Sequence, residues 1–175
     1  LADVHSLEQT LEADDRLGNA RAGLTGLDRQ FGAYGKAFNE LVAQQQKIGL
    51  GPEDGLYGRL RAAVHKVEEA LKAQDQQTLL ITMLQLRRAE KDFMLRSDIQ
   101  YLERFQTLHA AFQQGLGGLP QAQRNELEQA SEQYRQDFVA LVQGMQVLGL
   151  KETSGLRGQM HTLVQQAEQA SRVPA

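Results

Sequence analysis

Two positively charged residues fall on a stripe of the chain where a helix normally buries apolar side chains. From Leu56, a strict alternation of four and three residues passes through Leu60, Val67, Ile81 and Leu84, then reaches Arg88 and Lys91. This is the period of a buried helical seam. A charge buried there costs several kcal/mol unless it is paired or binds something. Because arginine offers carboxylates a planar fork and lysine a point charge, the sharper interpretation is a cationic pocket for a small organic anion.

Two other interpretations of this seam stay open. The cations could be neutralised in a structural network by carboxylates of a neighbouring helix or of the same segment, which contains Glu90, Asp92 and Asp98. Alternatively, the helix rotates at Ser97 or at the polar run before Leu79, and both cations face water.

A second polar group lies earlier in the chain. Arg61 and His65 are one helical turn apart, and Glu68 follows close to the next turn. Side chains at this spacing form solvated salt-bridge rows that contribute little to stability. They could equally supply cationic and hydrogen-bonding groups to a pocket between helices.

Residue patterns of common enzymes and metalloproteins are missing. The chain has no cysteine, its four histidines show no spacing that would place two metal ligands on one helical face, and it contains neither a GxxxxGK phosphate loop nor a GxSxG elbow. We therefore expect no catalytic residue, no metal and no cofactor, and we expect that the chain is not an enzyme. The net charge of −3, with both signs interspersed, argues against nucleic acid as a partner. No run of eighteen apolar residues, the length typical of a membrane span, occurs.

The chain repeats itself at an offset of 100 residues. Residues 34–70 align without a gap on residues 134–170, and 13 of the 37 positions are identical. In each copy apolar residues at helical spacing precede a Gly-Leu pair; Gly49 and Gly149 can close a helix, and Asp54 and Ser154 can cap the next one. Each unit is therefore predicted to be a helix, a turn of about five residues and a second helix, arranged as an antiparallel hairpin.

Helices are expected over residues 4–48, 55–112, 120–148 and 155–171. The second of these is weakened by a polar run at 73–78 and by Ser97-Asp98, which can stop one helix and cap the next. The predicted fold is all-α: an elongated antiparallel four-helix bundle built from a duplicated helical hairpin, with two stacked modules as an alternative. Residues 1–175 are expected to form a single domain.

Two segments also carry a family resemblance. They are GLYGRLRAAVHKVEEAL, from Gly55 to Leu71, and LQLRRAEKDFMLRSDIQYLERF, from Leu84 to Phe105. Together they resemble the sensor region of bacterial methyl-accepting chemotaxis receptors, most closely the helical bimodular (HBM) type. The positions that carry the resemblance are Gly55, Leu56, Gly58, Leu60, Arg61, His65, Glu68, Arg87, Arg88, Glu90, Lys91, Asp92, Phe93, Arg96, Asp98 and Tyr101.

The resemblance implies an extracytoplasmic sensor domain on the periplasmic side of the bacterial inner membrane. In the full protein it would be flanked by two transmembrane helices, form a homodimer and bind a small molecule such as an organic acid. The candidate ligand-binding residues are Arg61, His65, Arg88, Lys91 and Arg96. Binding would displace one helix slightly against its neighbours.

Other outcomes remain open at this point. The EKDF stretch also occurs in sensor regions of histidine kinases and cyclic-dinucleotide synthases, and a helical bundle that binds another protein would need no small ligand. The second repeat has His161 and Gln165 where the first has Arg61 and His65. This asymmetry favours one working site in the chain rather than two.

Overall fold

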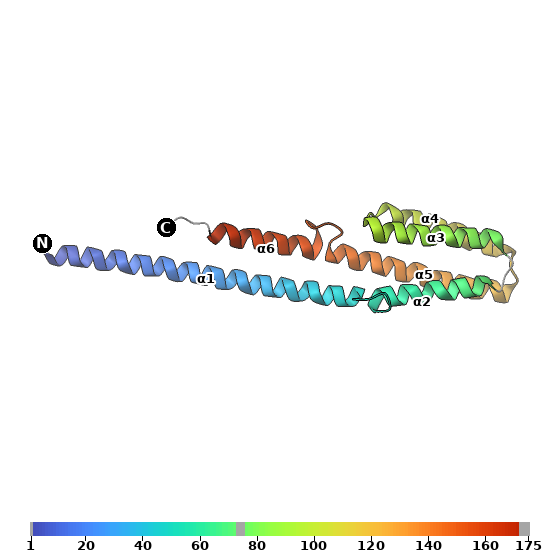
Figure 1. Cartoon of the computed structure of the whole chain (residues 1–175), viewed down its shortest axis with the longest axis horizontal. Helices are drawn as coiled ribbons and strands as arrows, with labels where there is room; N and C mark the ends of the chain where they lie inside the picture. The colour runs from blue at the N-terminus through green and yellow to red at the C-terminus, as the bar shows by residue number, and fades with distance from the viewer. Residues whose placement is uncertain (1, 73–75, 172–175) are drawn as a thin grey trace.

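The computed structural model describes residues 2–72 and 76–171, with side-chain surroundings from residue 25 to residue 169 apart from residues 27 and 73–75. Within these ranges it contains helices and no strands. They are α1 (Ala2–Ile48), α2 (Gly55–Lys72), α3 (Gln77–Arg96), α4 (Gln100–Gly115), the short 3-10 helix η1 (Leu116–Gly118), α5 (Gln121–Leu148) and α6 (Gly155–Ser171). The all-α, elongated bundle predicted from the sequence is confirmed (Figure 1).

The predicted second helix is divided into α2, α3 and α4. The break after α3 lies at Ser97, whose φ of 52° is left-handed and whose N–H donates to the carbonyl of Phe93. The carboxylate of Asp98 then accepts the backbone N–H of Gln100 at 3.0 Å, at the start of α4. Ser97-Asp98 therefore ends one helix and begins the next, as predicted. The first half of the polar run at 73–78, residues 73–75, lies outside the described residues.

The two helices of each repeated unit lie end to end rather than side by side as the predicted hairpin. Figure 1 shows α1 continuing into α2 along one side of the molecule and α5 continuing into α6 along the other. The loop 49–54 leaves the helix and returns to its starting point. As a result, a Cβ on Gly55 would lie 2.5 Å from the Lys47 carbonyl oxygen and 2.9 Å from the Gly49 nitrogen. Gly55 also has a φ of +53°, a conformation that glycine adopts at little cost.

The two repeated units pack against each other in antiparallel fashion. The side-chain amide of Gln44 donates to the carbonyl oxygen of Gly144 at 2.9 Å, so equivalent residues of the two repeats meet at the centre. Gly144 leaves space for Gln44, Ile48 and Leu56, which lie within 3.3 Å of where its Cβ would be. A side chain at residue 144 would therefore crowd all three of these residues.

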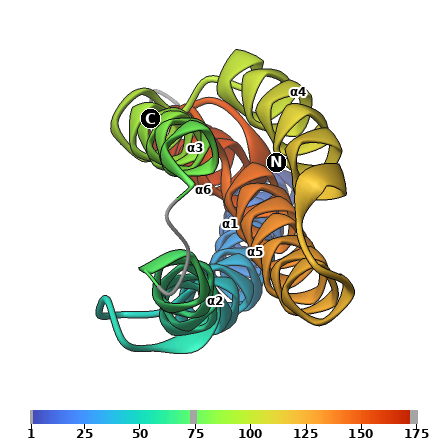
Figure 2. The same ribbon diagram turned by 90° about the vertical axis from the view of Figure 1, so that its right-hand side faces the viewer.

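The molecule has two parts along its length. Helices α2, α3, α4 and α5 surround a common core and form what we call the four-helix module (Figure 2). Helices α1 and α6 form a two-helix extension, here called the arm, and Figure 1 shows the N-terminal end of α1 projecting beyond α6. In the module, the rings of Phe93, Phe105, Tyr134 and Phe138 are fully buried and contact one another at centroid distances of 4.5 to 5.7 Å.

Position 58 has no room for any side chain, so only glycine fits there. A Cβ at this position would overlap the carbonyl group of Glu53, and the equivalent Gly158 is equally close to Thr153. Because backbone atoms cannot yield as a flexible side chain can, we expect Gly58→Ala to lower the free energy of unfolding by about 1–3 kcal/mol. Urea unfolding followed by circular dichroism would measure this. Gly117→Ala, where nothing lies within 4 Å of the added carbon, is the control and should be close to neutral. Equal effects of the two substitutions would contradict this view of the turn.

A buried histidine gives the module a predictable response to acid. The Nε2–H of His109 in α4 donates to the carbonyl oxygen of Ser131 in α5 at 3.1 Å, and the ring stacks on Phe105. Burial lowers the pKa of His109 below its usual value, against the opposing influence of Glu132. The unfolded chain therefore binds this proton more readily than the folded one, and stability contributed by neutral His109 is lost as the pH falls below about 6.5.

Replacing His109 by glutamine keeps a donor for Ser131 and removes the titration. Over the range from about pH 7 to pH 5, we expect the free energy of unfolding of His109→Gln to fall less steeply than that of the parent protein. Urea unfolding at several pH values measures both slopes. The remaining histidines, Glu132 and Arg135 are present in both proteins, so parallel slopes would show that His109 does not carry this dependence.

Candidate functional site

A groove of about 490 Å³ opens between the first inter-helix loop, α2 and α3. Leu50 and Pro52 of the loop form one wall, together with the aromatic ring of Tyr57 at the start of α2. The polar lining comes from two helices: α2 contributes Arg61 and His65, and α3 contributes Arg87, Glu90 and Lys91. Leu60 and Met94 complete the apolar surface. The groove therefore combines apolar walls with charged groups from facing helices, which is typical of small-ligand sites.

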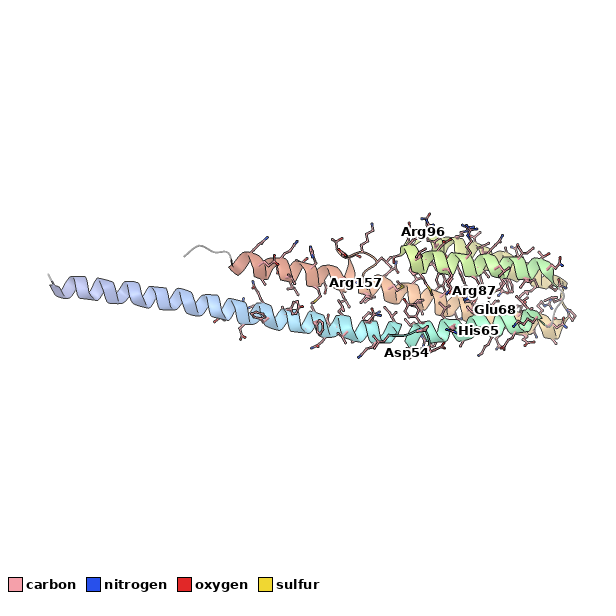
Figure 3. The ribbon with its side chains drawn as sticks, in the orientation of Figure 1. Asp54, His65, Glu68, Arg87, Arg96 and Arg157 are labelled. Carbon is pink, nitrogen blue, oxygen red and sulfur yellow. The ribbon has the colours of Figure 1, made fainter. Side chains whose placement is uncertain are left out.

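A chain of charged groups connects the two helices at this groove. On α2, His65 Nδ1 lies 3.5 Å from Glu68 Oε2. Across the interface, Arg87 Nε lies 3.6 Å from Glu68 Oε1, and Arg87 also donates to Glu90 at 3.2 Å. Figure 3 shows His65, Glu68 and Arg87 gathered between α2 and α3. Arg87 thus bridges two carboxylates from different helices and fixes their relative position.

Glu90 is the buried centre of this arrangement, with only 2% of its side chain exposed. Its carboxylate accepts the hydroxyl of Tyr134 in α5 at 2.6 Å, and Lys91 Nζ lies 3.5 Å away. Burial, reinforced by the neighbouring Glu90, raises the pKa of Tyr134 well above its usual range. The phenol therefore remains protonated and donates. Through Glu90 and Tyr134, the groove is connected to the helix that leads into α6.

Three of the five predicted ligand-binding residues meet in the groove. Arg61, His65 and Lys91 line it, and each keeps more than half of its side chain exposed. Arg61 pairs with Glu53 of the loop at 2.8 Å in a solvent-exposed contact, which typically contributes little to stability. These three side chains are thus accessible to a ligand carboxylate, and Arg61 can exchange its partner at low cost.

The other two predicted residues lie elsewhere. The prediction that Arg88 occupies a buried seam is wrong, because 75% of its side chain is exposed, and it lies 3.9 Å from Asp92. Arg96 also pairs with Asp92 at 3.9 Å, lies over the ring of Tyr101 and is on the outer side of α3 (Figure 3). Lys91 lines the groove, but it is 62% exposed rather than buried. Of the three interpretations of the seam, the one observed is that the helix is rotated, so that Arg88 and Lys91 face water.

The physical reason is a change of register between α2 and α3. After the break, the buried positions of α3 are Leu79, Met83, Leu86, Glu90 and Phe93, together with Ala89. The four-and-three alternation therefore restarts at Leu79, which places Glu90 on the buried seam and leaves Arg88 and Lys91 off it. Restarting the pattern after the polar run identifies Glu90 as the buried charge and its neighbour Arg87 as the partner. The role of Tyr134 could not be recognised from local sequence, because its contact with Glu90 spans 44 residues.

The second repeat carries a groove on a different face of the unit. It is lined by Thr153, Gly155, Gly158, Gln159, Thr162, Leu163 and Gln166, none of which is charged. His161 is exposed and contacts the amide of Gln165 at 2.9 Å. The positions equivalent to Leu50, Tyr57, Arg61 and His65 are Leu150, Arg157, His161 and Gln165, and none of these lines the second groove.

Two further observations concern the chemistry open to the described part of the chain. It contains no cluster of three or more histidine, aspartate or glutamate side chains placed to hold a metal ion. None of its helices is both long and apolar enough to cross a bilayer. Comparison with protein-family models, curated proteins and solved structures finds no match.

Proposed function

We propose that this chain is the ligand-binding domain of a transmembrane chemoreceptor of the helical bimodular type, and that it takes a small organic anion in the groove between α2 and α3. The observation that carries the proposal is the convergence of Arg61, His65, Arg87 and Lys91 on one partly apolar groove. Three of these were singled out from sequence alone. A groove of this size accommodates a small acid, and arginine binds carboxylates with two parallel hydrogen bonds.

A difference between the two repeats supports the same proposal. Both repeats retain the glycines of the loop and the apolar frame, whereas Arg61 and His65 of the first repeat are replaced by His161 and Gln165 in the second. Divergence at these polar positions is expected if only the first repeat has a ligand to bind. In the full protein, we propose, the domain lies on the periplasmic side of the inner membrane and is anchored by flanking helices.

The mechanism we propose starts from competition for cations. A ligand carboxylate entering the groove would attract Lys91 and Arg87, which in its absence face Glu90 and Glu68. The buried Glu90 would respond through its 2.6 Å hydrogen bond with Tyr134, and α5 would shift against α3. Since α5 continues end to end into α6, a small displacement at the groove can reach the arm (Figure 1). A kinase or a cyclic-dinucleotide synthase could use the same displacement as its input.

One observation favours a second candidate, a module that binds another protein through α3. The outer face of this helix exposes Ile81, Leu84 and Leu95, an apolar stripe on the side away from the core. Exposed apolar stripes of this kind often mark protein contacts. A module of this kind would retain the charges at the groove as a structural network and would need no small ligand.

Thermal unfolding in the presence of mono-, di- and tricarboxylates tests the proposal. A specific ligand at one hundred times its dissociation constant stabilises the folded state by about 2.7 kcal/mol and raises the melting temperature. We expect one class of acid to do so in the parent protein and in Arg88→Met, and to lose this effect in Arg61→Met. Arg88 is the matched control because it is an exposed arginine outside the groove. If no acid raises the melting temperature, or if both variants respond like the parent, the proposed function is wrong.

A further inference from the structure

The permanent charges around the groove cancel one another when His65 is neutral. Three arginine or lysine side chains line the groove, and each forms an ion pair with a glutamate. The pairs are Arg61 with Glu53 at 2.8 Å, Arg87 with Glu68 at 3.6 Å and Lys91 with Glu90 at 3.5 Å. A carboxylate that entered the groove would therefore leave it with one negative charge in excess.

His65 is placed to correct this imbalance. Its Nδ1 lies 3.5 Å from Glu68 Oε2, between α2 and α3, and 55% of its side chain is exposed (Figure 3). A neutral imidazole carries one N–H, whereas a protonated one carries two. Because Nδ1 is directed at Glu68, Nε2 is the nitrogen left to meet a ligand. Protonated His65 can thus donate to Glu68 and to a ligand carboxylate at the same time.

The other charged groups around His65 keep their charge near neutral pH. Arginine and lysine remain protonated there, and carboxylates normally remain ionised. On α5, Tyr134 stays neutral because burial raises its pKa well above the usual range, and Asp137 pairs with Arg59 at 3.7 Å outside the groove. Histidine is the side chain that changes its charge near neutral pH. Among the described residues that line the groove, His65 is thus the one whose charge can follow the pH.

We propose that the groove takes up its anion together with one proton, which is carried by His65. This inference rests on the proposed function and adds to it a regulation of the same site. With the proton bound, the groove has one positive charge in excess, which is complementary to a carboxylate. The coupling is reciprocal, so the anion retains the proton and the proton retains the anion.

The direction of the pH dependence follows from this coupling. As the pH rises through the range in which histidine titrates, the proton is lost and the anion is bound more weakly. As the pH falls, binding strengthens until His65 is fully charged. A receptor domain built in this way would respond to an acid most strongly in acidified surroundings.

Calorimetric titration of the folded protein tests the proposal. The probes are pyruvate, oxalate and tricarballylate, which are a mono-, a di- and a tricarboxylate. For an acid that binds the parent, we expect a binding constant about tenfold larger at about pH 6 than at about pH 8, the effect of one charge-assisted contact. Titrations at about pH 7 in two buffers of different ionisation enthalpy should show net proton uptake on binding. Thermal unfolding is less suitable here, because its pH dependence also contains the contribution of His109.

Two histidine variants identify the group that takes up the proton. His65→Gln keeps a polar side chain but cannot be protonated, so the proton uptake and the difference between the two pH values should be lost. His161→Gln is the matched control, because it removes an exposed histidine of the second repeat and should behave like the parent. Any protonation of the acid itself is the same in all three proteins and cancels in the comparison.

The possible outcomes separate this inference from the proposed function. Equal affinity of the parent at both pH values would overturn the inference and leave the proposed function standing. Proton uptake that persists in His65→Gln, or that disappears in His161→Gln, would have the same consequence. If none of the three acids binds the parent at either pH, both the inference and the proposed function are wrong.

Discussion

Phe138→Ala is expected to lower the free energy of unfolding by about 3–5 kcal/mol, as is typical when a large aromatic side chain is removed from a core. The ring of Phe138 is fully buried and contacts Phe93 at a centroid distance of 5.7 Å and Phe105 at 4.5 Å. These rings come from α3, α4 and α5, so the cavity would open at the meeting point of three helices. Because the remaining rings are tightly packed, they cannot move far enough to fill the cavity.

Urea unfolding followed by circular dichroism would measure this loss. Leu95→Ala is the matched control, since it also shortens an apolar side chain, but one that is 81% exposed on α3. Its effect should stay within about 0.5 kcal/mol. A loss at Phe138 no larger than that at Leu95 would mean that the aromatic cluster does not form the core of the module.

Arg87→Met is expected to be the most damaging change in the groove, with a loss of about 3 kcal/mol. Removing one partner of a buried ion pair typically costs 3–5 kcal/mol because a charge is left unpaired. The lower end applies here, because 29% of Arg87 is exposed and Lys91 remains close to Glu90. Arg88→Met, one residue along, removes an exposed guanidinium and should change stability by no more than about 0.5 kcal/mol.

A second substitution at Glu90 distinguishes two causes of the stability loss in Arg87→Met: an unpaired buried charge and a general loss of packing. In Arg87→Met/Glu90→Gln the buried group is neutral, and its amide oxygen can still accept the hydrogen bond of Tyr134. We therefore expect the double variant to be more stable than Arg87→Met alone. If it is less stable, or if Arg87→Met behaves like Arg88→Met, then Glu90 is not held by Arg87 in the way described.

The helix boundaries were predictable because they are determined by local residues. Gly49 and Gly149 both have positive φ values, and Ser97 with Asp98 supplies a left-handed end and a capping carboxylate within two residues. None of these features depends on distant contacts. The repeat also predicted correctly that the same loop occurs twice.

The path of the chain across those loops was not predictable from local signals. A loop of this length can reverse a helix or continue it, and the outcome depends on where the next helix finds a partner. Here α2 packs on α5 and α1 on α6, so each unit is extended and the antiparallel pairing occurs between units. The contact of Gln44 with Gly144 shows this pairing, but it joins residues 100 positions apart.

The groove was predictable in part, for a related reason. Arg61 and His65 lie on α2, before residues 73–78, so the wrong alternation in α3 does not affect their placement. Lys91 lies near the edge of the predicted apolar stripe of α3, so it also lines the groove. Arg88 was misplaced because the four-and-three alternation was carried through residues 73–78 without a restart. The contact of Glu90 with Tyr134, which joins helices that meet only in the fold, required the structure.

The most direct test of the proposed function is a calorimetric titration of the most stabilising acid into three proteins: the parent, Lys91→Met and Arg88→Met. Lys91 lines the groove and Arg88 lies outside it, yet the two are three residues apart on one helix and both are mostly exposed. Saturable binding is predicted for the parent and Arg88→Met, with affinity at least about tenfold weaker in Lys91→Met, the loss of one charge-assisted contact. Absence of binding to the parent, or equal affinity in all three proteins, would contradict the account.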